Sequence, residues 1–345
     1  MKDMLKKAAY KFKQAGTAMY LSICLILLFL ISLFISHNIK SVNKNENLED
    51  TFGREGEAYK RLSVFFSPKL EMDRSDIMEL RNKLTVQLGN SPSVETSQQK
   101  TVFLDAYEGG GTLQVSYQNT FLLADAAFVG GNYFDFHRMS FLRGNKFSEE
   151  DLIRDKAVIS ESLSFALFGS SDSIGKTIWI NERGIIVCGV IADKNRQWEK
   201  LMGSDTKKIY LPYGSMEELG CSTALISYEI LLPEPLEGFA MKTVEEAFGI
   251  NRYEREASLR EKEISIVEET NRFHMERLFK TGMNLNKRTM KTVSIVFPDW
   301  ENEKVIVENR LLFIYVMRMI IGIWLIKNLF LYIWKKRKEK EIKIL

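Results

Sequence analysis

The stretch that decides the fold is residues 126–193, which read AAFVGGNYFDFHRMSFLRGNKFSEEDLIRDKAVISESLSFALFGSSDSIGKTIWINERGIIVCGVIAD. Within it, alternating β-branched residues lie on either side of Glu182-Arg183-Gly184, and this pattern predicts two strands joined by a turn. SESLSFALFG ends at Gly169 and predicts a short helix, and we expect another over SEEDLIRD (148–155). The stretch is therefore typical of a mostly β segment with short helices.

Three consecutive glycines lie further toward the N-terminus, in VFLDAYEGGGTLQVSY (102–117). Runs that resemble strands flank Gly109-Gly110-Gly111, so the pattern predicts a turn at the glycines. Together with the stretch quoted above, this predicts a β-rich lobe over residues 100–221.

Two similar units flank the β-rich lobe. In the first, the strand RLSVFF (61–66) is followed by Pro68 and by a helix that Ser75 opens, with apolar positions on one face at Ile77, Leu80, Leu84 and Leu88 and an end at Gly89. In the second, the strand ALISYEILL (224–232) is followed by Pro233 and Pro235 and by an amphipathic stretch with Leu236, Phe239, Thr243, Ala247 and Phe248, closed by Gly249.

These units predict an α+β fold, in which a small α+β lobe of residues 59–99 and 222–300 carries the β-rich lobe as an insertion. We also expect a helix near 269–281 and a strand over TVSIVF (292–297).

Two apolar segments lie outside this domain. Residues 14–36 have no charge, and residues 311–334 are apolar apart from Arg318 and Lys327. Each is long enough to cross about 30 Å of hydrocarbon as a helix, so we predict two transmembrane helices. A cleaved signal peptide is a poor alternative because the first segment exceeds an h-region, and a lipoprotein site at Cys24 is poor because Ile23 is bulky.

Two interpretations remain open for Arg318 and Lys327. Each lies about 10 Å inside the second span by its position in the helix, where a long side chain reaches toward the headgroups. Alternatively, one of them is a contact with an acidic group on the span of a partner protein. The two residues are nine positions apart and point to different faces of the helix.

The flanking charges predict the orientation. Lys-rich residues 1–13 and the basic tail 335–345 mark the cytoplasmic side, which places residues 37–310 outside the cytoplasmic (inner) membrane. The basic charge thus lies at the two ends, and the segment between them is net acidic, which excludes a nucleic-acid-binding protein.

Candidate chemistry is sparse. Five residues separate Gly169 from Gly175 in GSSDSIGKT, where a phosphate-binding loop has four, so we expect a turn before the strand TIWI. The three histidines are scattered, and we predict no catalytic, cofactor-binding or metal-binding residues and no enzyme activity. Cys188 and Cys221 either form a disulfide or, in the case of Cys188, stay as a buried free thiol.

Residues 126–193 resemble the MacB-like periplasmic core domain of ABC transporter permeases, the group that includes the FtsX-like proteins. The resemblance rests on Asn132-Tyr133-Phe134, Leu142-Arg143-Gly144 with Phe147 and Asp151, AVISESLSFALFG up to Gly169, Ile174-Gly175-Lys176, and Val187 with Gly189-Val190. The motif residues are interpreted as structural: the glycines suit turns, Tyr133 and Phe134 suit core positions, and Asn132 suits a local cap.

The resemblance implies a non-catalytic permease-like subunit whose extracytoplasmic domain takes part in export or mechanotransmission driven by a separate ATPase. It implies as partners the lipid bilayer, an ABC ATPase or a longer permease, and a homo- or hetero-oligomer. Such permeases continue through further spans, whereas 11 residues follow Trp334 here, so we expect a short two-span version or a truncated remnant. The alternative is a membrane-anchored binding or interaction module without ATP coupling.

Overall fold

The computed structural model describes residues 22–39, 48, 52, 58–89, 103–151, 153–193, 207–250, 263–282 and 294–344. The chain divides into two compact units. We call Met1–Asn45, Phe273–Asn284 and Val305–Leu345 the helical unit, and Glu46–Arg272 and Leu285–Lys304 the sheet unit. Each unit is described by itself.

A ten-stranded sheet forms the centre of the sheet unit, in the order β10-β1-β9-β2-β3-β8-β5-β7-β4, with β6 pairing with β2 and β7. Most neighbouring strands are antiparallel, whereas β3 with β8 and β5 with β7 are parallel. The strands are β1 (Tyr59–Phe66), β2 (Leu104–Tyr117), β3 (Thr120–Gly131), β4 (Phe141–Gly144), β5 (Lys156–Ser160), β6 (Thr177–Ile180), β7 (Arg183–Ile191), β8 (Lys208–Pro212), β9 (Leu225–Pro233) and β10 (Ile264–Glu268).

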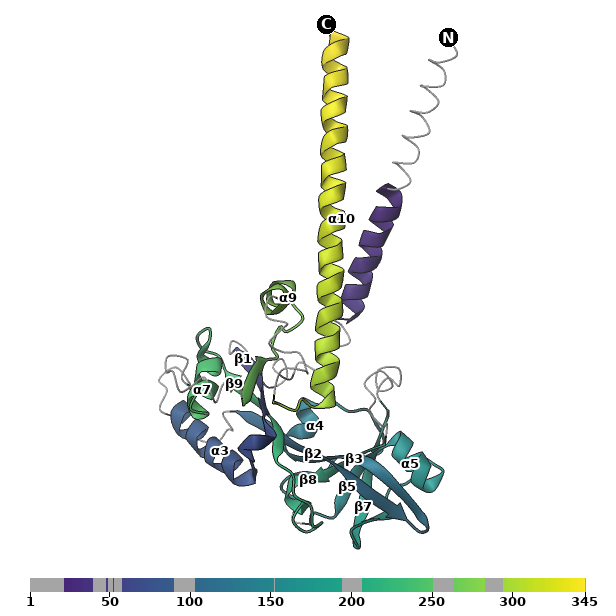
Figure 1. Cartoon of the computed structure of the whole chain (residues 1–345), viewed down its shortest axis with the longest axis vertical. Helices are drawn as coiled ribbons and strands as arrows, with labels where there is room; N and C mark the ends of the chain where they lie inside the picture. The colour runs from purple at the N-terminus through teal and green to yellow at the C-terminus, as the bar shows by residue number, and fades with distance from the viewer. Residues whose placement is uncertain are drawn as a thin grey trace. The chain divides into compact units, whose positions relative to one another are not determined.

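The helices of the sheet unit lie against this sheet, and Figure 1 shows α3 and α7 beside β1 and β9. They are the 3-10 helix η1 (Pro68–Leu70), α3 (Arg74–Gly89), α4 (Tyr133–Phe136), α5 (Glu161–Phe168), the 3-10 helix η2 (Tyr213–Ser215) and α7 (Phe239–Ala247). The remaining helices are α9 (Met275–Gly282) and α10 (Asp299–Ile344).

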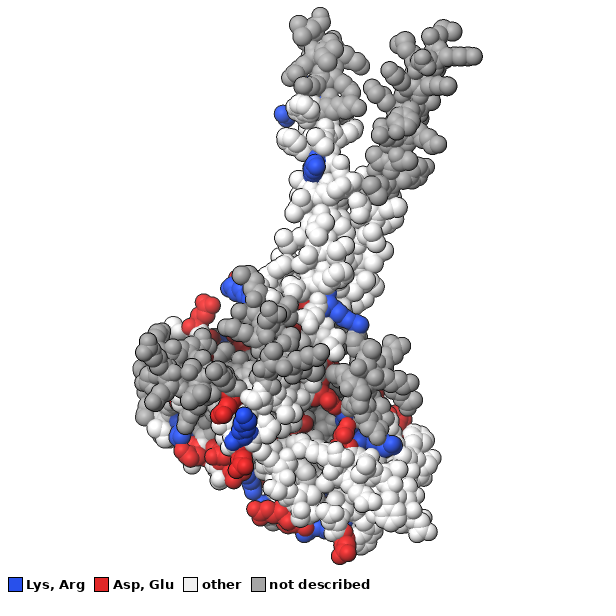
Figure 2. Space-filling model, viewed as in Figure 1, with Lys and Arg blue, Asp and Glu red and all other residues white. Residues whose placement is uncertain are grey.

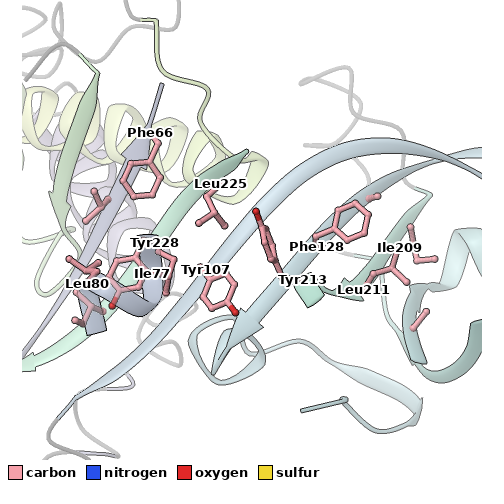
Figure 3. Close-up of a cluster of buried hydrophobic side chains, with 14 of the residues drawn as sticks. Phe66, Ile77, Leu80, Tyr107, Phe128, Ile209, Leu211, Tyr213, Leu225 and Tyr228 are labelled. Atoms are coloured by element: carbon pink, nitrogen blue, oxygen red, sulfur yellow. The ribbon is translucent and has the colours of Figure 1, made fainter. Parts of the chain in front are cut away.

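The predicted apolar face of α3 is confirmed. Ile77, Leu80, Leu84 and Leu88 are all buried in the main core, together with Phe66 of β1. The core continues along the sheet through Tyr228 and Tyr107 to the side chains beneath β3 and β8 (Figure 3). Asp73 caps the helix because its carboxylate accepts the N–H groups of Ser75 and Asp76 at 2.7 and 3.2 Å.

The second strand-and-helix unit is also confirmed. β9 is buried along most of its length and pairs with β1 and β2. α7 follows Gly238 and buries Ala240, Thr243, Val244 and Ala247. The predicted helix over SESLSFALFG is α5, capped by the Ser160 hydroxyl and ended by Gly169 at φ 68°. The hairpin of β6 and β7 and the turn before TIWI are present as predicted.

The prediction of a turn at the three glycines is wrong. β2 runs straight through Gly109, Gly110 and Gly111, and its hairpin with β3 closes at Tyr117 and Thr120. Gly109 and Gly110 make room for neighbouring side chains instead: a Cβ on Gly109 would lie 3.1 Å from both Tyr213 and Thr223, and a Cβ on Gly110 would lie 3.1 Å from Ile226. A glycine in a strand often marks such a close approach.

The predicted helix over SEEDLIRD is also wrong, since its described residues form no helix. Their acidic side chains are engaged elsewhere. Glu149 accepts hydrogen bonds from the Tyr107 hydroxyl at 2.5 Å and from the Gly131 N–H at 2.7 Å, and Asp151 pairs with Lys156 at 2.9 Å. Residues 148–151 instead form a turn, in which the Asp151 N–H donates to the Ser148 carbonyl at 3.2 Å, and Glu149 contacts β2 and β3.

Two predictions near the end of the sheet unit need correction. The helix expected near 269–281 begins only at Met275, because Ile264–Glu268 extend the sheet as β10 and a turn follows. Residues 292 and 293 of the predicted strand TVSIVF lie outside the described residues, and 294–297 form no strand. Ile295 and Phe297 pack on Phe65 instead, with ring centroids of the two phenylalanines 5.0 Å apart.

Cys24, Cys188 and Cys221 are all free thiols, so the disulfide does not form. The alternative prediction for Cys188 is confirmed in that the thiol is free, but the side chain is partly buried and not fully buried. Its thiol donates to the Ala157 carbonyl at 3.3 Å, and burial raises its pKa to about 11.

Two helices are long and apolar enough to cross a membrane by length and composition, Ser22–Ile39 and the part of α10 from Asp299 to Trp334. The predicted second span, 311–334, lies within α10, and residues 22–36 of the predicted first span are helical, its earlier residues lying outside the described ones. Figure 2 shows mostly uncharged side chains along the described part of the long helix, with a few basic ones. Within the helical unit, Leu278 of α9 packs with Leu311 and Tyr315 of α10.

Candidate functional site

The first six residues of α10, Asp299–Lys304, belong to the sheet unit. Pro298 precedes the helix and accepts the N–H of Glu301 at 3.1 Å, and Asp299 and Glu301 lie in the first turn, where carboxylates interact favourably with the helix dipole. Side chains of these six residues contact three parts of the sheet unit: the turn after β10, strand β2 and strand β8.

The first contact is a buried ion-pair network next to β10. Arg272 donates to the Glu301 carboxylate with two hydrogen bonds, at 2.5 and 2.7 Å, and to Glu269 at 2.8 Å. Lys304, one turn further along α10, donates to Glu269 at 2.9 Å. Glu301 has no exposed surface and Arg272 is 3% exposed. Such a buried network is costly to break because any partner that remains is left charged without a counter-ion.

The second contact is the side chain of Trp300. Its indole N–H donates to the Glu108 carboxylate of β2 at 2.9 Å. The Trp300 ring packs against two other rings: its centroid lies 4.8 Å from that of His137 and 5.5 Å from that of Phe65. The Lys304 ammonium lies 4.7 Å from the indole centroid, within range of a cation–π interaction.

The third contact joins α10 to β8, where Lys208 donates to Asp299 at 2.7 Å. Unlike the network of Arg272, this pair is partly exposed. It adds less to stability, because water screens exposed ion pairs.

A second buried charge cluster lies between β1 and β9. Arg61 donates to Glu229 at 2.7 Å, and the His137 Nε2 pairs with the other oxygen of the same carboxylate. Glu229 lies in the middle of β9 and is 1% exposed. Burial opposes its ionisation, but His137 and Arg61 hold the pKa of Glu229 well below its usual range. Burial lowers the pKa of His137.

A pocket of about 550 Å³ lies beside Trp300. Its walls come from β2, β3, β8, the segment after α4 and the first turn of α10, all within the sheet unit. Tyr133, Tyr210, Phe297 and Trp300 supply aromatic surface. The charged side chains that line it are Glu108, Asp125, Arg138, Asp193, Lys208, Asp299 and Glu303. Its volume is in the range of sites that hold a small organic molecule.

Glu108 is the most buried carboxylate of this pocket, at 8% exposed. Burial raises the pKa of Glu108 to about 7, and the negative charge of Glu229 acts in the same direction. The hydrogen bonds from Trp300 and Tyr133 and the charge of Lys208 act in the opposite direction. Glu108 is therefore a group that changes its charge near neutral pH.

Some predicted motif residues lie next to this site. Tyr133 and Phe134 belong to α4 and are buried in a second core cluster with Phe147, and Tyr133 also lines the pocket. Asn132 occupies the N-cap position of α4, but its side chain makes no cap hydrogen bond. Its amide donates to the Asp105 carbonyl at 3.4 Å instead.

The predicted glycines lie away from the pocket. Gly144, Gly169 and Gly175 all have positive φ, at 67°, 68° and 78°, as turn glycines require. Gly189 is different, because a Cβ there would lie 2.7 Å from the Asn145 carbonyl oxygen. These four glycines therefore allow backbone conformations or close backbone contacts that a side chain would disturb.

Arg318 lies in the helical unit and faces the helix Ser22–Ile39. Its guanidinium donates to the Ser32 carbonyl at 2.6 Å, to the Ser32 hydroxyl at 3.1 Å and to the Ser36 hydroxyl at 2.7 Å. Its Cζ also lies 5.2 Å from the ring centroid of Tyr315. Lys327 is exposed. A contact of either residue with a partner protein stays a prediction.

Sequence reasoning missed the charged groups at the start of α10 and in the middle of the sheet. One signal was available: Arg61 and Glu229 are charged residues within the mostly apolar runs RLSVFF and LISYEILLP. A charge at a core position requires a partner, because burying an unpaired charge is costly. The identity of the partner depends on strand pairing, which the local pattern does not contain.

Comparison with protein families gives one match for most of the chain. Residues 23–242, more than half of the chain, match the family described as MacB-like periplasmic core domain. The matched range contains most of the sheet unit and the helix Ser22–Ile39, except its first residue.

Curated relatives match a shorter part. The macrolide export ATP-binding/permease protein MacB of Neisseria gonorrhoeae is 36% identical over 107 residues, which is 30% of this chain and 16% of that protein. The protein of the same name from Shigella dysenteriae is 32% identical over 108 residues, with the same coverage. The match thus spans about a sixth of the length of these relatives.

Two solved structures are similar at low sequence identity. The periplasmic region of MacB from Actinobacillus actinomycetemcomitans is 15% identical with a TM-score of 0.43, covering 67% of this chain and 94% of that one. The extracellular domain of the noncanonic ABC-type transporter YknZ from Gram-positive bacteria is 14% identical with a TM-score of 0.39, covering 60% of this chain and 99% of that one.

Proposed function

Because this chain belongs to the family with a MacB-like periplasmic core domain, we propose that it is a non-catalytic membrane subunit of an ABC-type export or mechanotransmission complex. In this proposal a separate ATPase drives movement of the membrane helices, and α10 passes that movement to the sheet unit. The curated relatives are named as ATP-binding/permease proteins for macrolide export, which supports a transport role for the family but assigns no cargo to this chain.

The observation that carries the proposal is the set of contacts at the start of α10. The helix is continuous from Asp299 to Ile344 and contains the second candidate span. Its first turns hold the sheet through buried ion pairs of Glu301 and Lys304 and through the Trp300 indole. A helix fixed in this way transmits a displacement or rotation of its membrane part, because the buried pairs resist separation.

The proposed orientation places both termini in the cytoplasm and the sheet unit outside the cytoplasmic membrane. The basic ends of the chain support it. Single cysteines at Ser41 and Glu182, in a background with Cys24, Cys188 and Cys221 replaced by serine, should react with an impermeant maleimide on spheroplasts. Cysteines at Lys7 and Lys340 should react only after the membrane is permeabilised. The reverse pattern contradicts the proposed orientation.

Co-purification tests the proposed partner. The full chain, extracted in a mild detergent from its native membrane, should bring down an ATPase with Walker motifs, a longer permease or both, identified by mass spectrometry. Glu301→Gln should retain the ATPase but reduce the transport or signalling output of the complex, because Glu301 belongs to the sheet unit, which the proposed orientation places on the opposite side of the membrane from the ATPase. Glu246→Gln on the exposed face of α7 is the matched control and should leave that output unchanged.

Repeated isolation of the chain without an ATPase would contradict the proposal and favour the second candidate, a membrane-anchored binding module without ATP coupling. The pocket beside Trp300 is the observation that favours this second candidate. A binding module should keep its cellular role in a strain from which candidate ATPases are deleted, whereas a coupled subunit should lose it.

A further inference from the structure

The pocket beside Trp300 combines two features that recognise one class of ligand. Aromatic side chains enter it from three elements: Tyr133 from α4, Tyr210 from β8 and Trp300 from α10. Carboxylates also predominate over bases among the described residues that line it, with five acidic side chains against Arg138 and Lys208. Aromatic faces attract cations, and a net negative pocket strengthens that attraction.

The bases do little to offset this charge. Lys208 donates to Asp299 at 2.7 Å, so its charge is compensated within the wall. Arg138 is exposed and its charge is screened by water. Glu108, by contrast, is buried at the aromatic side of the pocket next to the Trp300 indole. A cation in the pocket beside the Trp300 side chain would therefore lie close to a desolvated carboxylate, where electrostatic attraction is stronger than in water.

We propose that this pocket binds an organic cation that carries an apolar ring system, held between the aromatic side chains and the carboxylates of Glu108 and Asp125. A pocket of this size suits a molecule of several rings.

The ligand would contact both the sheet and the start of α10. Glu108 and Asp125 lie on β2 and β3, whereas Trp300 and Glu303 lie on α10. Occupancy would thus favour the arrangement in which α10 is held on the sheet, since a ligand shifts an equilibrium toward the state that it contacts better. The role of such a ligand as cargo or signal of a complex rests on the proposed function, but its binding does not.

Fluorescence polarisation with two dyes tests the site. Rhodamine 123 is a monocation and fluorescein is an anion, and both have the same fused three-ring core. We use the full chain in nanodiscs of a zwitterionic lipid, with empty nanodiscs subtracted, and no ATPase. Rhodamine 123 should bind at least tenfold more tightly than fluorescein. Equal binding of the two dyes, or no binding of rhodamine 123 above the empty nanodiscs, would overturn the proposal.

Variants locate the binding to this pocket. Glu108→Gln and Asp125→Asn should each weaken rhodamine 123 binding at least fivefold, and Glu246→Gln, an exposed carboxylate of α7, should not. A thermal melt of each variant verifies folding. If Glu108→Gln does not fold, Asp125→Asn and Trp300→Phe decide the question. Binding that all folded pocket variants leave unchanged lies elsewhere and would refute the assignment.

The pH dependence gives an independent readout. Glu108 is faced by Tyr133 of α4, Lys208 and Tyr210 of β8, Glu229 of β9 and Trp300 of α10. With a pKa of about 7 for Glu108, its ionised fraction and hence the affinity for rhodamine 123 should rise up to about tenfold from pH 6 to pH 8. The rise should be absent in Glu108→Gln, and a rise that persists there would contradict the role of this carboxylate.

Since no ATPase is present in this assay, its failure would remove the ligand site and leave the proposed coupling untouched. Failure to co-purify an ATPase or a longer permease would contradict the proposed coupling and leave the ligand site untouched.

Discussion

Arg272 and Glu301 are joined by two parallel hydrogen bonds of 2.5 and 2.7 Å, although 29 positions separate them in the chain. The pair links the turn after β10 to the first turn of α10. A planar guanidinium that matches a carboxylate in this way fixes orientation as well as distance. The first turn of α10 is therefore held within the sheet unit by a buried ion pair.

Removing Arg272 should destabilise the sheet unit strongly. Arg272→Gln leaves the buried carboxylates of Glu301 and Glu269 without their main counter-charge, which costs about 3–5 kcal/mol. We expect this loss in the free energy of unfolding of the full chain, measured by urea titration in mild detergent. Lys242→Gln breaks the exposed pair with Glu246 and should cost less than about 1 kcal/mol. Equal losses would show that the Arg272 network is not a buried anchor.

Glu108 should make stability fall as pH rises. Burial raises its pKa from 4.5 to about 7 in the folded state, so the folded chain holds a proton that the unfolded chain releases. The resulting stabilisation is fully present below about pH 4.5 and is lost as pH rises through about 7; its size is about 3 kcal/mol. Denaturation at several pH values measures it.

Glu108→Gln should remove this dependence. The difference in unfolding free energy between wild type and Glu108→Gln should shift against the wild type between pH 4.5 and 7.5. The matched control is Glu246→Gln, which replaces an exposed carboxylate of α7 in the same way. A constant difference for Glu108→Gln would mean that the pKa of Glu108 is the same in the folded and the unfolded chain.

The elements that the sequence could predict are those with local signals. The face of α3 follows from the spacing of Ile77, Leu80 and Leu84, and the end of α5 follows from Gly169, because side-chain periodicity and backbone preferences act over a few residues. The hairpin of β6 and β7 follows from the alternating residues on either side of Glu182-Arg183-Gly184, although the turn itself lies at Asn181 and Glu182 and β7 already begins at Arg183.

The wrong predictions concern segments whose conformation depends on residues far away in the sequence. Gly109 suggests a turn by composition, but the contact that it permits is with Tyr213, more than 100 positions away. Glu149 would fit a helix by local preference, yet it lies in a turn and its carboxylate accepts hydrogen bonds from Tyr107 and the Gly131 N–H. The candidate site was missed for the same reason: Glu108 and Trp300 meet only through the pairing of β2 with its neighbours and the position of α10.

Gly144 and Gly169 should differ in their tolerance of a side chain. Both have positive φ, but a Cβ on Gly144 would collide with the backbone carbonyl of Cys188, whereas a Cβ on Gly169 would meet nothing within 4 Å. Gly169→Ala should cost about 1 kcal/mol from backbone strain alone. Gly144→Ala should cost clearly more, because β7 must also shift. Thermal melts of both variants measure the difference, and equal losses would mean that the end of β4 adapts freely.

Arg318 and the two serines that it contacts should respond unequally to substitution. The hydroxyls of Ser32 and Ser36 also donate to the carbonyls of Phe29 and Leu33 of their own helix, so Arg318→Leu leaves them with partners. The double variant Ser32→Ala and Ser36→Ala instead deprives the guanidinium of two acceptors, and leaving a donor unsatisfied costs more than removing it.

We therefore expect the double serine variant to lower the stability of the full chain in detergent by about 1–2 kcal/mol and Arg318→Leu to lower it less. Lys327→Leu, at an exposed position of the same helix, is the control. Co-purification of a partner distinguishes two interpretations of Arg318: a contact between the two helices of this chain alone, or an additional contact with the partner. If Arg318 also pairs with a carboxylate on the span of a partner, Arg318→Leu should reduce co-purification of that partner while the serine variant retains it. Unchanged recovery with Arg318→Leu would restrict its role to the contact between the two helices of this chain.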